Sequence, residues 1–278
     1  MTAVVLALCA AALWGAGDFL GGFASRRTAV LVVLFWSQLA GLTGLVVWVV
    51  WSGAGRPGVG AVLAALGAGF AGVAGLACLY RGLAVGAMGI VAPISATSPV
   101  VPLVVDIGRG RSPGTVQWIG IVVALAGVVL VSRQPGPGRA PVVAAGVGLA
   151  LAAALGFGLF VVGLGVAAQE SPSWAAATAR FASVCTVVAA LAATRTSVRC
   201  SQRLLPLIVA VGIFDAGANA LIAVAATHGS IGIVAVLSAL YPVMTILLAR
   251  ALLHEHLGAT RVGGGLIAVA GAALIAAG

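Results

Sequence analysis

The chain has 278 residues, of which 62% are hydrophobic and 7% are charged, and its formal net charge is +9. A soluble globular domain carries about a quarter charged residues, so this chain cannot cover a water-facing surface and its solvent must be lipid. The positive charge comes from 14 arginines that lie mostly in short loops between apolar stretches. This placement indicates membrane topology and argues against nucleic-acid binding.

Apolar stretches of about 20 residues predict membrane-spanning helices, because every backbone group in hydrocarbon must be satisfied within its own segment. A membrane β-barrel would need alternating segments of about ten residues, and the long runs here do not alternate. We therefore predict an all-α integral membrane protein. Hydropathy and the Gly, Pro and Arg breaks give ten transmembrane helices, at residues 2–23, 28–52, 59–80, 83–106, 114–132, 141–168, 173–194, 204–227, 230–250 and 259–277.

Two stretches of the chain, residues 80–102 and 223–245, repeat one pattern at a constant offset of 143. In this register Ser95 lines up with Ser238, and the prolines that follow four residues later also coincide. An internal duplication inside a membrane-embedded chain is the signature of a transporter built from two halves around a central site.

The longest Pro/Gly-rich stretch, residues 133–140, is predicted to be the linker between the halves. Residues 1–132 then form the first five-helix repeat and residues 141–278 the second. Five spans per half insert the second half upside down, and the arginine bias of corresponding loops does reverse between the halves. Odd-numbered loops hold ten arginines and even-numbered loops three, which favours both termini outside, although Arg109 and Arg111 oppose this locally.

Three motifs carry a resemblance to a known family: WGAGDF at residues 14–19, SALYPVMT at 238–245 and LHEHL at 253–257, followed by a Gly-rich last helix. In this order they resemble the EamA repeat of the drug/metabolite transporter (DMT) superfamily over nearly the whole chain. The resemblance implies a secondary carrier of the cell inner membrane, monomeric or homodimeric, with ten helices as two inverted EamA repeats. It also implies a central cavity and no cofactor. The family's acidic residue before the last helix is present as Glu255, whereas the first repeat has Arg111 there.

Ionisable side chains inside spans cost about 2.5–3.5 kcal/mol on insertion scales, so they normally face the interior of the bundle. Three residues qualify: Asp18, Arg180 and Asp215. Asp215 has Asn219 one turn later on the same face, which predicts a site for a cationic or amine-bearing substrate or for a proton. The alternative is a polar clamp between helices.

Asp18 follows Trp14 by four residues, so a carboxylate and an aromatic ring share one face and can hold a cation together. Its position near the end of the span also allows a capping role. Arg180 must pair with a carboxylate in the bundle or with an anionic group of the substrate. The sequence does not choose between Asp18 and Asp215 as the partner.

Ser238, Tyr241 and Thr245 follow i, i+3, i+7 spacing, which predicts one polar stripe along the ninth span. The first repeat offers Ser95 and Ser98 at the corresponding places. Two such stripes are what a central pathway needs, but hydroxyls inside apolar helices also bond to backbone carbonyls.

Trp36 and Gln38 in the second span are further candidates for lining the site. His254 and His256 lack the i, i+4 spacing with which two histidines bind zinc from a helix, and the four cysteines are isolated. No metal site is therefore expected.

Together these features predict a secondary active exporter of small metabolites, such as amino acids or drug-like solutes, that works by alternating access in the lipid bilayer. Proton coupling through Asp18 or Asp215 and facilitated exchange are both allowed. A flippase of a lipid or polyprenyl-phosphate carrier with the same fold is the alternative. An intramembrane enzyme would need clustered acids, and the five acids here are scattered.

Overall fold

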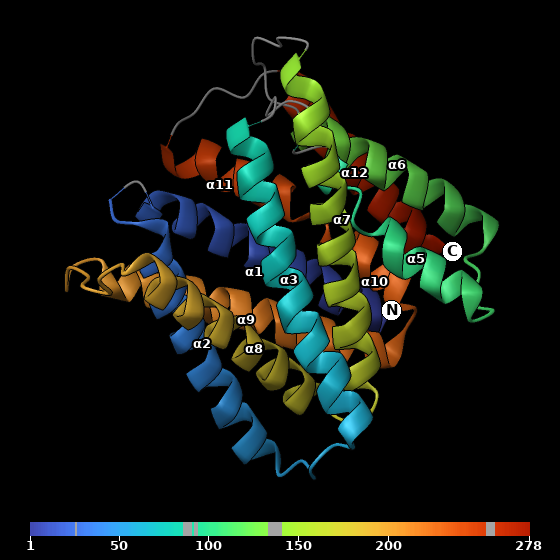
Figure 1. The fold of residues 1–278 in the computed structure, drawn as a ribbon. Coiled ribbons are helices and arrows are strands. Elements are labelled where there is room, and N and C mark those ends of the chain that lie inside the picture. Colours follow the sequence, from blue (N-terminus) through green and yellow to red (C-terminus); the bar gives the residue numbers. More distant parts are fainter. Residues whose placement is uncertain (26, 86–90, 92–93, 133–140, 254–258) are drawn as a thin grey trace.

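The computed structural model describes residues 1–25, 27–85, 91, 94–132, 141–253 and 259–278. Every regular element among these residues is a helix (Figure 1). The helices are α1 (Thr2–Ser25), α2 (Val30–Ser52), α3 (Val59–Val85), α5 (Val100–Gly108), α6 (Thr115–Ser132), α7 (Pro141–Ala168), α8 (Pro172–Thr194), α9 (Leu205–His228), α10 (Ile231–Ser238), α11 (Tyr241–Leu253) and α12 (Ala259–Ala277). The predicted all-α class is therefore confirmed.

Six helices among the described residues are long and apolar enough to cross a membrane: α1, α2, α3, α7, α8 and α9. Shorter apolar helices cover residues 115–130, 231–245 and 262–277. Part of the predicted span 83–106 lies outside the described residues. The count of ten crossings stays a prediction, because it requires the shorter and broken helices to span as well.

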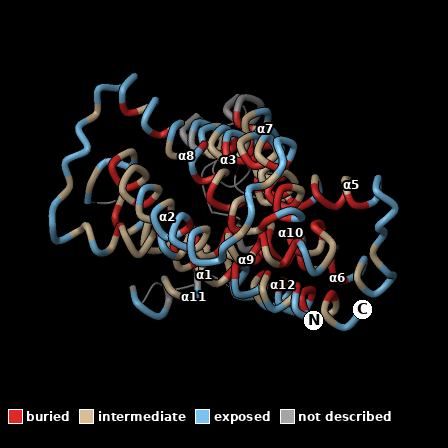
Figure 2. Tube along the Cα trace, turned by 90° about the horizontal axis from the view of Figure 1, so that it is seen from below, coloured by how far each residue is buried: buried red, intermediate tan, exposed pale blue. Residues whose placement is uncertain are grey.

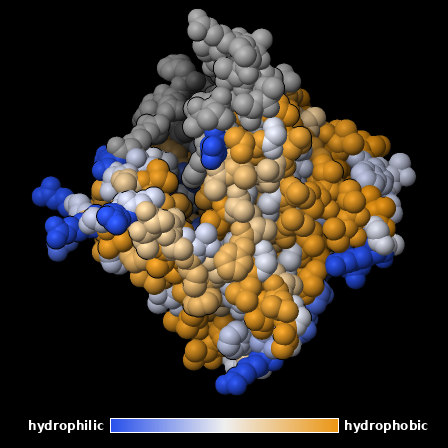
Figure 3. All heavy atoms as spheres, viewed as in Figure 1, coloured by the Kyte–Doolittle hydropathy of each residue, from blue (hydrophilic) through white to orange (hydrophobic). Residues whose placement is uncertain are grey.

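The outer surface is apolar, as a lipid-facing surface must be. Leu266 is 68% exposed, Val122 64% and Val104 61%. Figure 3 shows hydrophobic residues covering most of the visible face, with hydrophilic residues gathered at its edges. Burying apolar side chains gains little in lipid, so this surface needs no polar cover.

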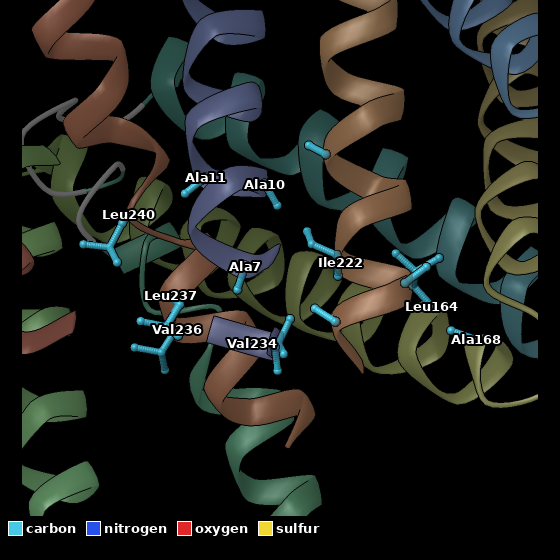
Figure 4. Packing of buried hydrophobic residues seen from close by; sticks show 14 of the residues in the cluster. Ala7, Ala10, Ala11, Leu164, Ala168, Ile222, Val234, Val236, Leu237 and Leu240 are labelled. Carbon is cyan, nitrogen blue, oxygen red and sulfur yellow. The ribbon is translucent and has the colours of Figure 1, made fainter. Parts of the chain in front are cut away.

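The interior is built largely from small side chains. Alanines such as Ala7, Ala10 and Ala218 are fully buried, and buried residues gather where α1, α7, α9 and α10 meet (Figures 2 and 4). Helices in lipid associate through close backbone approach at small residues, because packing supplies the attraction that hydrophobic burial supplies in water. The alanine and glycine content of the chain therefore sets how closely its helices pack.

Two pairs of corresponding helices, α2 with α8 and α6 with α12, contact each other and run antiparallel. In the α6–α12 pair, Gly120 lies against Gly271 and Gly127 lies against Gly264. In the α2–α8 pair, Ser52 near the end of α2 meets the start of α8, while Arg180 meets the middle of α2. Antiparallel packing of equivalent helices is what an internal two-fold relation between the halves requires.

Contacts between non-equivalent helices also obey the two-fold relation, in which α1 corresponds to α7, α2 to α8 and α3 to α9. Helix α1 packs against α9 as α3 packs against α7, and α2 packs against α9 as α8 packs against α3. Two tryptophans, one near the start of α2 and one near the start of α8, make corresponding hydrogen bonds. The indole of Trp36 donates to Val198 O after α8 (2.9 Å), and that of Trp174 donates to Ala54 O after α2 (3.2 Å). The halves are thus interleaved, and most helices contact the opposite half.

The prediction of a continuous helix over residues 230–250 is wrong. Helix α10 ends at Ser238 and α11 begins at Tyr241, with two turn residues between them. Pro242 has no backbone N–H, so the carbonyl of Ser238 loses its helical donor. At the break, Leu240 N donates to Leu237 O, three residues back, and not to the residue four back as in an α-helix.

The predicted span 83–106 is interrupted at the equivalent place. Residues 96–99 form a turn after Ser95, and α5 begins at Val100. Pro99 there plays the part of Pro242 in the second half, since it too lacks the donor that the preceding turn would need. Breaks at corresponding positions of the two halves mark the region in which such folds place their binding site.

The α6–α12 contact provides a test of small-residue packing. A Cβ added to Gly127 would lie 2.3 Å from the backbone nitrogen of Ala268. We expect Gly127→Ala to reduce the unfolding free energy by about 1–3 kcal/mol, because the two backbones must separate. Thermal unfolding in detergent measures the loss as a lower Tm.

Gly263→Ala on α12 is the matched control, because an added Cβ there meets nothing within 4 Å. An equal fall in Tm for both variants would contradict the close packing of α6 on α12.

Candidate functional site

Four polar side chains from four helices form a cluster. Asp18 lies on α1, Gln38 on α2, Arg180 on α8 and Asp215 on α9. Arg180 Nη1 lies 2.5 Å from Asp215 Oδ2 and donates to Gln38 Oε1, also at 2.5 Å. A Cβ added to Gly17, the neighbour of Asp18, would lie 3.7 Å from Asp215 N, so α1 passes close to α9 at Asp18. We call these four residues the polar cluster.

Close helix contacts hold Arg180 in place. Its side chain is only 3% exposed. A Cβ added to Gly212 of α9 would lie 2.1 Å from Ser37 O of α2, and one added to Gly41 would lie 3.6 Å from Arg180 Nε. The two glycines therefore let α2 and α9 approach each other beside the guanidinium. The ion pair with Asp215 decides between the two partners that the sequence left open.

Arg180 and Gln38 occupy corresponding places in the two repeats, 142 residues apart. They meet where α2 crosses α8, so the pseudo-two-fold axis that relates the halves runs close to the polar cluster. The chemistry is nevertheless asymmetric. At the offset of 143, Asp215 has Gly72 as its counterpart and Asp18 has Val161.

The polar cluster carries one uncompensated negative charge. Arg180 neutralises Asp215, whose side chain is 35% exposed. Asp18 is exposed and makes no hydrogen bond or ion pair with any described residue. It caps no helix end, so the capping interpretation is not supported. An accessible, unpaired carboxylate beside a neutralised ion pair attracts a cation.

An aromatic pair lies one turn from Asp18. Trp14 of α1 and Tyr241 of α11 meet edge to face, with ring centroids 6.1 Å apart and an interplanar angle of 81°. The Thr245 hydroxyl donates to the carbonyls of Gly15 and Tyr241, both at 3.1 Å. These contacts join the start of α11 to α1, and α1 carries both Trp14 and the carboxylate of Asp18.

Asn219 supplies a further polar group one turn beyond Asp215. It is 9% exposed, and its Oδ1 has no hydrogen-bond partner among the described residues. Two nitrogens of Arg180, Nε and Nη2, are likewise buried without a described partner. Buried polar atoms normally have a partner, so this side of the ion pair has unused capacity for a ligand or water.

The remaining hydroxyl candidates bond to the backbone. Ser238 donates to Ala235 O (3.1 Å), and Ser95 donates to Val91 O (3.0 Å). Ser98 lies in the turn of the first half, with no side-chain hydrogen bond to the described residues. The predicted stripe from Ser238 to Thr245 is not one helix face, because the helix is interrupted between its members.

Trp36 lies apart from the polar cluster. Its indole donates to Val198 O and its ring packs against Phe35 (centroids 5.2 Å apart), which places it at the end of the bundle near the α8–α9 loop. Gln38, two residues later, points to the other side and enters the polar cluster. The segment with His254, Glu255 and His256 lies outside the described residues.

One buried acid was missed by the sequence analysis. Asp106 near the end of α5 is 1% exposed and accepts hydrogen bonds from Ser230 Oγ and Gly232 N, both at 2.6 Å. Asp106 is the last residue of the predicted span 83–106, where a charged side chain is expected to reach the membrane–water interface. No local pattern indicates that α5 turns this side chain toward α10.

The fold and the polar cluster together define a multi-pass membrane protein with a charged interior site between two related halves. The sequence model of the EamA-like transporter family matches residues 1–133 and 144–277, so the chain belongs to this family, within the DMT superfamily. It is therefore a membrane transporter rather than a member of an enzyme family.

Solved structures share the fold. One, described as "Crystal structure of protein", has a TM-score of 0.81 and 18% sequence identity, and the match covers 98% of this chain and 95% of the other. At this identity the likeness concerns the fold alone. No curated protein sequence matches the chain at a significant level.

The ion pair gives a stability prediction. Asp215→Ala leaves the guanidinium of Arg180 buried with Gln38 alone, so we expect a loss of about 3–5 kcal/mol in unfolding free energy. The double variant Arg180→Leu/Asp215→Ala removes both charges and should recover part of that loss, measured as Tm in detergent. Asp18→Asn is the control and should leave Tm close to wild type. A double variant less stable than Asp215→Ala alone would contradict a penalty from the unpaired charge.

Proposed function

We propose that the protein is a secondary active transporter that exports a small cationic or amine-bearing solute across the cell inner membrane. Amino acids, whose ammonium group meets the same requirement, and drug-like amines are the candidate solutes. The observation that carries the proposal is the accessible carboxylate of Asp18, which has no ion-pair partner among the described residues and lies one turn from Trp14 and beside the neutralised Arg180–Asp215 pair.

Charge and aromatic surface together favour a cation. The formal charges of Asp18, Asp215 and Arg180 sum to −1, so a monocation brings the polar cluster to neutrality. A cation over an aromatic face gains about 0.5–1 kcal/mol at exposed sites and about 2 kcal/mol when desolvated. Carboxylate and ring placed one turn apart on α1 can contact one solute at two points, which favours an amine attached to an apolar body.

Alternating access fits the interleaved halves. Residues 1–132 and 141–278 are the two repeats in this proposal, joined by 133–140 and inserted with opposite polarity as ten helices. At one end of the bundle three hydrogen bonds join the halves: Gly58 N to Glu170 Oε2 (2.6 Å), the Ser52–Ser173 hydroxyl pair (3.3 Å) and Trp174 Nε1 to Ala54 O (3.2 Å). Opening this end requires their release, and closure of the other end would accompany it.

Proton coupling follows if the same carboxylate serves both ligands. A proton on Asp18 removes the charge that attracts the cationic solute, so the two ligands exclude each other and exchange across the membrane. One chain supplies all four residues of the polar cluster, so a monomer is sufficient for transport even if the protein forms a homodimer.

A lipid flippase is the second candidate, and one observation favours it. An apolar groove of about 360 Å³ lies between α1, α11 and α12, with Leu8, Leu247 and Val269 among its lining residues. It begins at the helix break next to Tyr241 and would admit an acyl or prenyl chain. The negative charge of the polar cluster argues against a phosphate headgroup. Transport of a polyprenyl phosphate in reconstituted vesicles, without binding of any amine, would favour this second function.

Ligand-induced thermal shifts test the proposed substrate class. We expect tyramine, phenylalanine and putrescine to raise the Tm of the purified protein, and uridine and glucose to leave it unchanged. Asp18→Asn should abolish the shift because it removes the unpaired charge. Glu170→Gln, an exposed acid outside the polar cluster, should keep it. A shift with uridine or glucose but with no amine would overturn the proposal.

Exchange in liposomes tests the coupling. For an amine that raises the Tm, we expect an imposed pH gradient to accelerate transport by the wild type and not by Asp18→Asn. Counterflow without a gradient separates loss of coupling from loss of binding. Gradient dependence that survives in Asp18→Asn would remove this carboxylate from the coupling step.

A further inference from the structure

Helix α10 has only eight residues. Its C-terminal end is the helix break at Ser238, two residues before α11 begins at Tyr241. Its N-terminal end begins after Ser230, whose hydroxyl accepts from Ile233 N at 3.2 Å. A rod of this length, about 12 Å, has no room to bend, so the position of one end fixes the other.

A carboxylate from the opposite half holds the N-terminal end. Asp106 Oδ2 on α5 accepts from the Ser230 hydroxyl and from the backbone N–H of Gly232, each at 2.6 Å. Gly232 permits this approach, because a Cβ there would lie 2.8 Å from the Leu103 side chain and 2.9 Å from Leu103 Cα. The first turn of α10 is therefore bonded to α5 at two donors.

Asp106 is buried more deeply than this bonding alone explains. It is 1% exposed, and its Oδ1 has no partner among the described residues. Of the four acids that the structure describes, it is the one classed as buried. Burying a half-satisfied carboxylate is costly, and the positive end of a helix dipole offsets only part of that cost. An Asn at this place could accept from Gly232 N without a buried charge, so the contribution of the carboxylate can be measured by substitution.

The far end of α10 leads directly to the proposed transport site. Helix α10 packs against α1, and Figure 4 shows Ala7 of α1 beside Val234 and Leu237 of α10. Past the break, Tyr241 meets Trp14, which is one turn from Asp18 on α1. The bond at Asp106 therefore lies at one end of α10, and the aromatic contact at Tyr241 lies just past the helix break at its other end.

We propose that Asp106 is a positioning residue of the transport site, which fixes α10 and thereby holds the helix break and Tyr241 against Trp14. Its carboxylate spans the two halves, so the anchor must be released or carried along when the halves move. The device belongs to one half alone, because the residue at the corresponding place of the second repeat, 143 positions later, is Ala249. The assignment of a transport site rests on the proposed function, whereas the anchoring of α10 does not.

The chain offers a matched control with the same bond chemistry. Glu170 accepts from the backbone N–H of Gly58 at 2.6 Å and so also joins one half to the start of a helix, α3, in the other. It is exposed, and α3 is a long helix without a break at its start. Loss of this bond should affect the first turn of α3 and leave α10 unchanged.

Hydrogen–deuterium exchange in nanodiscs tests the anchor locally. We expect Asp106→Ala to accelerate exchange across residues 229–238 about tenfold, as loss of a helix cap does, and to leave α6 unchanged. Asp106→Asn keeps an oxygen that can accept from Gly232 and should give intermediate exchange. Ser230→Ala removes one donor and should accelerate the first turn of α10 only. Glu170→Ala should change residues 58–62 and not α10.

Labelling of the helix break gives a second readout. Ser238 is 1% exposed, so Ser238→Cys in a background without the four native cysteines should react slowly with a maleimide. Adding Asp106→Ala should speed the labelling, and adding Asp106→Asn should restore most of the protection. If Asp106→Ala simply unfolds the protein, exchange will also accelerate in α6. In that case the milder variants Ser230→Ala and Asp106→Asn decide whether the bond to Asp106 holds α10.

The inference is overturned if exchange in residues 229–238 and labelling at Ser238→Cys match the wild type in both Asp106→Asn and Ser230→Ala, and in Asp106→Ala where it folds. Tyramine binding, measured by thermal shift, separates the two proposals. Weaker tyramine binding in Asp106→Ala supports the positioning role. If the wild type binds no amine while α10 still loosens in Asp106→Ala, the proposed substrate fails and the anchor stands.

Discussion

The ion pair between Arg180 and Asp215 is the interaction around which the interior is arranged. A guanidinium in a lipid-embedded helix is tolerated only where protein surrounds and neutralises it. Gly41 and Gly212 let α2 and α9 approach each other beside it, and Gln38 takes a further hydrogen bond. Because the pair uses the charge of Asp215, the carboxylate of Asp18 has no ion-pair partner in the part of the chain that the structure describes, and the proposed function depends on this difference between two neighbouring acids.

The two halves share a scaffold but not its polar groups. Contacts such as Gly120 with Gly271 and Gly127 with Gly264 obey the two-fold relation, because packing at small residues needs only backbone geometry. Asp18, Asp215 and Asp106 have no acidic counterpart in the other repeat. In the proposed transporter, the duplicated scaffold would supply a symmetric hinge for alternating access, while the substitutions in each copy would supply one site instead of two.

Two carboxylates act across the boundary between the halves. Asp106 accepts from the first turn of α10 and Glu170 accepts from Gly58, just before α3, whereas Asp215 and its partner Arg180 belong to the same half. In a low-dielectric interior a bond such as that of Asp106 is strong, and leaving it unmade is costly. In the proposed transport cycle, relative movement of the halves would have to release or exchange the bonds of Asp106 and Glu170.

Hydropathy was enough to predict the all-α membrane class and the candidate charges Asp18, Arg180 and Asp215, because cost in lipid depends on residue type and segment length alone. The duplication followed from the residue pattern repeated at an offset of 143. Hydropathy did not determine which acid pairs with Arg180, that residues 230–250 break after Ser238, or that Asp106 is buried. Ion pairing depends on which helices cross and at which residues they cross, and hydropathy contains no information on contacts between helices that are distant in sequence. Proline signalled that the helix would be disturbed, but only the packing of α1, α5 and α10 decided that it would end.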